Sequence, residues 1–136
     1  DAMGVTVAVG PDALADRDPA VVVDALVGYG LDGPLRGVPA EMIAAVPDPT
    51  GATVSLDVPS GTNATTGDRP GPGVDPDRVV TLALPKTGLS AVDAEVVLAD
   101  IGIPAGVYEA LAIPYEPPFG GEYWSELYHR ADGEPA

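Results

Sequence analysis

The sequence predicts an α/β sandwich built on a mostly parallel sheet, and three observations lead to this fold class. Short, valine-rich apolar runs alternate with Gly- and Pro-rich segments and with two helix-like stretches, which is the pattern of strand–helix units. The run 21–26 is almost continuously apolar, as expected for a parallel strand that is buried on both faces. The length of 136 residues fits one domain with a sizeable core.

The first half of the chain is expected to contain three strands and one helix. Pro39 suits the first turn of a helix, and Pro47 ends that helix. Pro59 and Gly61 stop the third strand abruptly. In order, the expected elements are strands over 4–9 and 21–26, a helix over 39–46 and a strand over 54–58.

The second half begins with a long segment, 62–77, that has no helical period. A gap of about ten residues separates the two strands that follow, which is short for a parallel crossover, so the later strand could run antiparallel. Residues 122–130 could form one or two amphipathic turns within the tail, and the last five residues are expected to fray. The expected elements are strands over 79–84 and 95–101, a helix over 105–111 and an irregular tail over 113–136.

Composition and charge exclude several classes of function. The formal charge is −15, from 21 acidic and six basic residues, and Lys86 is the only lysine. Such a chain offers no basic patch for nucleic acid. No apolar run approaches the roughly 20 residues that span a bilayer, and no signal-like start is present, so a cytoplasmic protein is expected. The absence of cysteine excludes disulfides and thiolate metal sites.

The acidic composition has two interpretations, and the sequence leaves both open. A salt-adapted source would explain it, because screening by salt relieves the self-repulsion of an acidic surface. A GC-biased genome combined with an ordinary acidic protein explains it equally well.

Polar residues gather where the predicted strands end. If the second, third and fourth strands are parallel, their carboxyl ends share one edge of the sheet, where ligands bind in open α/β folds. That edge would carry Asp24 and the loop 28–34, then Asp57 and Ser60, then Lys86. Each feature alone also fits a simple turn, since Asp, Pro, Ser and Gly are common turn formers. Their repetition at three strand ends favours a ligand site.

The residue types at this edge limit its chemistry. Glycines let backbone N–H groups approach an anionic ligand, and a carboxylate in a partly closed pocket can act as a general acid or base. Asp24 and Ser60 offer hard oxygen ligands, which suit an alkali or alkaline-earth cation better than zinc. The only histidine, His129, lies near the end of the chain, which argues against a Ser-His-Asp triad.

Five segments of the chain occur in an order and at spacings that match a known family: VVDALVGYGLDGPLRG at 22–37, SLDVPSG at 55–61, NATTG at 63–67, TLALPKTGL at 81–89 and ADIGIP at 99–104. Through these segments the chain resembles the YjeF N-terminal domain family, the NAD(P)HX epimerases, and the resemblance covers the later, C-terminal portion of that domain. The resemblance implies a Rossmann-like three-layer αβα sandwich, a homodimer, and epimerisation of hydrated NADH and NADPH at the hydrated nicotinamide carbon.

The resemblance also implies roles for individual residues. Asp24 and Ser60 match positions that bind one potassium ion. Asp57 matches an acid that contacts the substrate, and it is the predicted catalytic residue for proton handling, with Lys86 as a weaker candidate for a charge near the substrate. The matching substrate-binding loop comprises Gly28, Tyr29, Gly30, Leu31, Asp32, Gly33 and Pro34.

The sequence departs from the family in one respect that concerns activity. The family's earlier loop of the Gly-Asn-Asn-Gly-Gly-Asp kind is missing, and Asn63 is the only asparagine. Thr62 and Thr65 also replace a hydrophobic residue and an Asp that are usual there. The chain is therefore expected to be one partial YjeF N-terminal-like domain. It is either a fragment of a longer protein, which is the favoured interpretation and would be inactive or nearly inactive alone, or a divergent member that cannot make the full site. The alternative is a non-catalytic nucleotide- or protein-binding scaffold module of the same fold.

Overall fold

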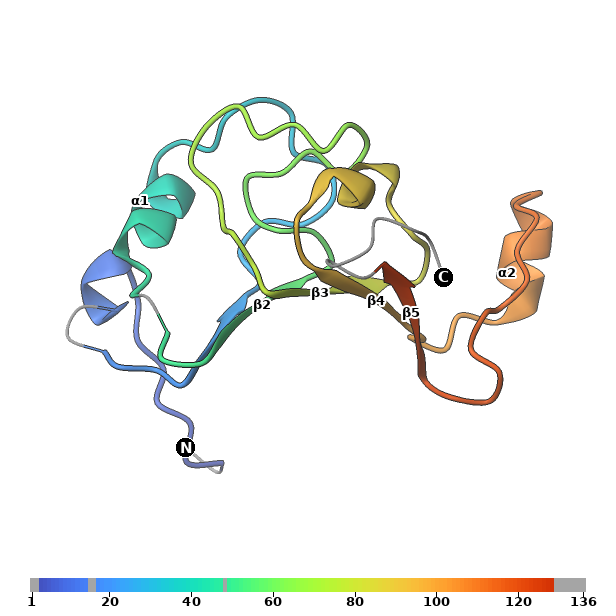
Figure 1. Ribbon diagram of the computed structural model, residues 1–136, viewed down its shortest axis with the longest axis horizontal. Helices are drawn as coiled ribbons and strands as arrows, with labels where there is room; N and C mark the ends of the chain where they lie inside the picture. Colours follow the sequence, from blue (N-terminus) through green and yellow to red (C-terminus); the bar gives the residue numbers. More distant parts are fainter. Residues whose placement is uncertain (1–2, 15–16, 48, 129–136) are drawn as a thin grey trace.

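The computed structural model describes residues 3–14, 17–47 and 49–128, which form one five-stranded sheet (Figure 1). The strand order is β1-β2-β3-β4-β5. The first four strands are parallel and the fifth is antiparallel to its neighbour. This confirms the α/β class and the mostly parallel sheet. The strands are β1 (Val21–Asp24), β2 (Ala52–Leu56), β3 (Arg78–Leu82), β4 (Glu95–Ala99) and β5 (Trp124–Tyr128).

Two α-helices and two 3₁₀ helices complete the described elements. In Figure 1, α1, η2 and the long loops lie above the sheet, and α2 lies beyond its β4–β5 end. The η1 turn packs against α1. Both predicted α-helices are confirmed to within a residue. The helical elements are η1 (Pro11–Leu14), α1 (Val38–Ala45), η2 (Thr87–Ala91) and α2 (Ala105–Ala110).

The core lies on the side of the sheet that faces η2. Leu89 of η2 and Ala64 of the β2–β3 connection pack there against inward side chains of β3 and β4, among them Val79 and Val96. The opposite face is open along β1, where Val23 is 66% exposed and Val21 is exposed as well. The prediction that 21–26 is buried on both faces is therefore wrong, because β1 has a covering layer on one face only.

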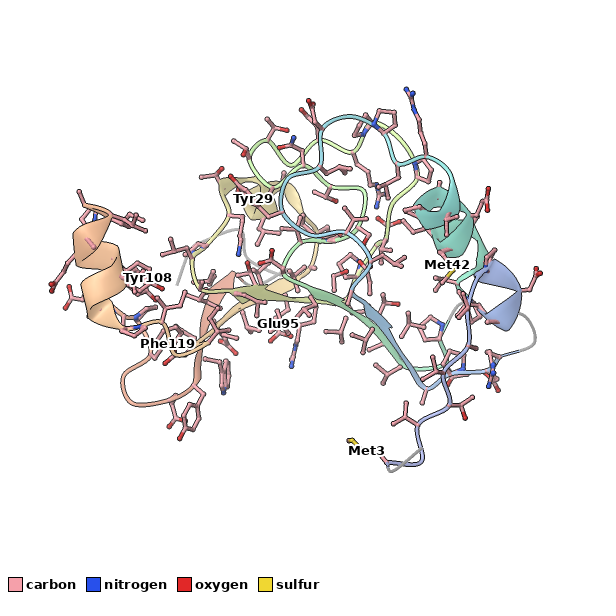
Figure 2. The ribbon with its side chains drawn as sticks, turned by 180° about the vertical axis from the view of Figure 1, so that it is seen from behind. Met3, Tyr29, Met42, Glu95, Tyr108 and Phe119 are labelled. Atoms are coloured by element: carbon pink, nitrogen blue, oxygen red, sulfur yellow. The ribbon has the colours of Figure 1, made fainter. Side chains whose placement is uncertain are left out.

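The predicted strand over 4–9 is also wrong. Val5, Val7 and Val9 have the alternation of a strand, yet all three are exposed. Within the described residues, no backbone hydrogen bond joins this segment to a strand. A β-strand requires backbone hydrogen bonds to a neighbouring strand. The alternation of apolar residues alone therefore does not produce a strand. Figure 2 shows Met3, at the start of this segment, on the side of the sheet opposite to Tyr29.

Two features of the second half also correct the sequence-based expectations. The strand over 95–101 runs parallel to β3, because the compact η2 turn returns the chain to the start of the sheet within a short connection. Residues 124–128 form β5 rather than amphipathic turns, because they pair with the edge of β4 through backbone hydrogen bonds. The tail from 113 is thus only partly irregular, and its last eight residues, with His129, lie outside the described part.

Candidate functional site

The parallel strands bring the predicted site residues to one edge of the sheet. The register pairs Asp24 at the end of β1 with Ser55 of β2, two residues before Asp57. The Asp57 N–H donates to the carbonyl of Val80 in β3 at 2.8 Å. The connection that carries Lys86 begins directly after β3. The predicted convergence at three strand ends is therefore present in the structure.

Asp24 is buried, with 5% of its surface exposed, and its carboxylate is surrounded by neutral donors. Oδ2 accepts the Ser55 hydroxyl at 2.9 Å and the Ser60 N–H at 2.8 Å. Oδ1 accepts the Ser60 hydroxyl at 2.6 Å and the Leu26 N–H at 3.4 Å. The Val27 N–H in turn donates to Ser60 Oγ at 2.9 Å. The cluster ties the end of β1 to β2 and to the turn that follows β2.

The donor set at Asp24 and Ser60 fits an alkali cation in its chemistry. Both residues present hard oxygen atoms, as such cations prefer. The chain's own donors occupy all four acceptor positions of Asp24. Rotation of the Ser60 hydroxyl toward the Val27 carbonyl, 3.2 Å away, would free one of them. In the described part of the chain, no three His, Cys, Asp or Glu side chains converge as a metal site.

Asp57 stands outside regular strand geometry. Its φ is 69°, in the left-handed region that Asp tolerates better than most non-glycine residues. Oδ1 accepts the Leu82 N–H at 3.3 Å and also receives the ammonium group of Lys86. Oδ2 points toward Gly28, where a Cβ atom would lie 3.2 Å from it. Among the described residues Oδ2 accepts no hydrogen bond, so one carboxylate oxygen is held and the other is free.

Lys86 forms an ion pair with Asp57, with 14% and 21% of the two side chains exposed. Its Nζ also donates to the Leu82 carbonyl at 2.6 Å. The pair joins two parallel strand ends, because Asp57 follows β2 and Lys86 follows β3. Cation and carboxylate therefore lie together at the predicted edge, although the sequence separates them by 29 positions.

The predicted substrate loop approaches this pair at Gly28. Gly28 lies against Asp57, and Leu31 is held by its carbonyl, which accepts the Asn63 side-chain amide at 3.2 Å. Gly30 and Gly33 have φ values of 97° and 84°, which glycine adopts readily. Tyr29 is exposed and lies on the α1 and η2 side of the sheet (Figure 2). Asp32 and Pro34 are exposed as well.

Two residues of the site were not predicted from the sequence. Ser55 is fully buried and donates to Asp24, and its inward position follows from the two-residue period of β2. Asn63 fixes the loop at Leu31, while its side-chain oxygen accepts the N–H groups of Thr65 and Thr66. The segment Asn-Ala-Thr-Thr-Gly at 63–67 is rich in turn formers, but the partner across the loop is not evident from sequence.

The fold and the edge site define an α/β domain with a candidate ligand site at the carboxyl ends of parallel strands. The chain belongs to the family described as YjeF-related protein N-terminus, whose model matches residues 1–88. Within the described residues, no helix is long and apolar enough to cross a membrane.

Relatives named NAD(P)H-hydrate epimerase support the same assignment. The chain is 42% identical over 109 residues to one from Dehalogenimonas lykanthroporepellens, covering 79% of this chain and 44% of the relative. It is 36% identical over 112 residues to one from Rhodopirellula baltica, covering 76% and 46%. The chain thus spans less than half the length of these relatives.

A solved structure supports the fold. The crystal structure of yeast ynu0, YNL200c, superposes with a TM-score of 0.56, covering 79% of this chain and 46% of that one. The two sequences are 23% identical, so the similarity concerns the fold alone.

Proposed function

We propose that the protein carrying this chain is an NAD(P)H-hydrate epimerase, which interconverts the two epimers of hydrated NADH or NADPH in the repair of nicotinamide nucleotides. The observation that carries the proposal is the Asp57 carboxylate, with one oxygen held and the other facing the Gly28 loop. The names of the relatives support it.

The proposed chemistry needs a group that gives and takes one proton. Epimerisation at the carbon bearing the added hydroxyl proceeds if this hydroxyl is protonated and leaves as water. The neighbouring ring nitrogen then shares the positive charge, and water returns to the opposite face and releases a proton. Asp57 Oδ2 is the proposed carrier of that proton, because no described protein group occupies it. The loop 28–34 is the proposed contact for the nucleotide.

The test is an epimerase assay on the full-length polypeptide that carries these 136 residues. One purified epimer is incubated with the polypeptide, and chromatography measures how fast the other epimer forms. We expect the polypeptide to catalyse the equilibration of the two epimers. The 136-residue chain assayed alone is expected to be nearly inactive. Absence of catalysis by the full-length polypeptide would contradict the proposal and would favour the alternative, a nucleotide- or protein-binding scaffold module of the same fold.

Potassium is proposed as the cation at Asp24 and Ser60, where it would neutralise a buried carboxylate. The acidic composition is proposed to reflect adaptation to salt. We expect the melting temperature of the protein to rise between low and molar KCl. We also expect this rise to be larger in KCl than in LiCl of equal ionic strength. An equal rise in both salts would contradict the potassium site, and no rise in either would contradict salt adaptation.

The remaining proposals concern the setting of the protein. A homodimer in the cytoplasm is proposed by analogy with the family. Nucleic acid is not a proposed partner, because a net charge of −15 repels phosphate backbones. Sedimentation of the full-length polypeptide would test the dimer, since a monomer at micromolar concentration would contradict it.

A further inference from the structure

Lys86 has a mostly buried side chain, although the chain contains many other carboxylates with which a lysine could pair. It is the only lysine in a chain with 21 acidic residues. Its side chain is 14% exposed. Moving an ammonium group out of water costs free energy, and this desolvation can exceed the Coulombic gain of the resulting ion pair. Stability alone is therefore a weak explanation for the contact between Lys86 and Asp57.

The backbone at Lys86 is fixed independently of its side chain. Lys86 directly precedes η2, whose Gly88 N–H donates to the Ala64 carbonyl at 2.9 Å. A Cβ atom on Gly88 would lie 2.5 Å from the Asn63 carbonyl oxygen, so only glycine lets η2 approach this closely. The backbone from which the Lys86 side chain extends is therefore held in place next to the candidate site.

The contacts of the ammonium group separate the two oxygens of Asp57. Nζ donates to Asp57 Oδ1 and to the Leu82 carbonyl, and the Leu82 N–H donates to the same Oδ1. Without these donors, rotation of the carboxylate could present either oxygen to a substrate. With them, Oδ1 is held at the end of β3 and Oδ2 alone faces Gly28.

We infer that Lys86 is a positioning residue for the proposed epimerisation. Its ammonium group anchors Asp57 Oδ1, so that Oδ2 meets the substrate in a single orientation. The inference rests on the proposed function and assigns Lys86 a role exerted through Asp57 rather than through contact with the reacting carbon. Misplacement of a reacting group by about 1 Å can lower a rate about 100-fold, so the anchor affects turnover more than binding.

The experiment replaces Lys86 in the full-length polypeptide and measures kcat and KM separately. Lys86→Met keeps the aliphatic stem and removes the charge, and we expect kcat to fall about 100-fold with KM within about twofold of wild type. Arg78→Met is the matched control. It removes the ion pair of Arg78 with Glu95, two neighbouring residues of β3 and β4, and kcat should stay at the wild-type value.

Chemical rescue separates positioning from a structural role. In Lys86→Ala, added ethylammonium is expected to restore part of kcat, whereas in Asp57→Ala it should restore none. Unimpaired kcat in Lys86→Met, or a defect confined to KM, would overturn the inference. Failure of ethylammonium to raise kcat in a folded Lys86→Ala would overturn it as well. An inactive wild type would instead overturn the proposed function.

Discussion

The ends of β1 and β2 each carry a carboxylate, and the fold places the two in opposite environments. Asp24 is 5% exposed and accepts four neutral donors, and no described lysine or arginine side chain forms an ion pair with it. The side chain of Asp57 is 21% exposed, shares one oxygen with Lys86 and leaves the other open. A saturated buried carboxylate joins strands, whereas a carboxylate with one open oxygen can exchange a proton.

The backbone reinforces the same contrast. Asp24 continues the regular parallel register of β1 against β2. Asp57 adopts a φ of 69° at the end of β2, a conformation that turns its side chain out of the strand alternation. The comparison predicts that substitutions at Asp57 lower activity and substitutions at Asp24 lower stability.

The largest expected effect belongs to Asp57→Asn. The amide keeps the size of the side chain but cannot carry the proton, so kcat for epimerisation should fall by roughly 10²- to 10⁴-fold. The melting temperature should fall, because the ammonium group of Lys86 loses its charged partner, but the variant should remain folded, because the Asp57 side chain lies outside the core. Turnover of one purified epimer and a thermal melt check the two halves. A variant with wild-type kcat would remove Asp57 from the mechanism.

Asp24→Asn should act mainly on stability. The amide nitrogen would face donors where an acceptor is needed, which costs on the order of 3 kcal/mol in the free energy of unfolding. Ser55→Ala, which deletes one donor to Asp24, should cost about 1 kcal/mol. Urea titrations measure both values. Equal stability of the Asp24 variant and wild type would show that the cluster contributes nothing net.

The third prediction, Gly28→Ala, is expected to have the smallest effect. It tests the surroundings of Asp57 Oδ2. The new methyl group would lie 3.2 Å from Oδ2, so the carboxylate must shift by a few tenths of an ångström. We expect kcat to fall about tenfold with little change in stability. Gly106→Ala in α2 is the control, because its Cβ would meet nothing within 4 Å. If both variants kept full activity, the proximity of Gly28 and Asp57 would be unimportant for turnover.

Much of the fold could be predicted from local patterns. Valine-rich runs bounded by Pro and Gly predicted β1 to β4, and Pro39 predicted the start of α1. The errors came from the pairing of strands and from the cover over β1, which no local pattern contains. Residues 4–9 alternate like a strand without a ladder partner, while residues 124–128 form a strand because the edge of β4 offers one.

The sequence by itself determined which side chains end the parallel strands, since the end of each apolar run could be located from Pro, Gly and Asp. It therefore placed Asp24, Asp57, Ser60 and Lys86 at one edge of the sheet. Only the tertiary structure decided that the Asp24 carboxylate accepts four hydrogen bonds, whereas Asp57 keeps one oxygen without a described donor. The physical reason is that, apart from the Leu26 N–H, their partners lie 25 to 36 positions away in sequence, and only strand register brings them within hydrogen-bonding distance.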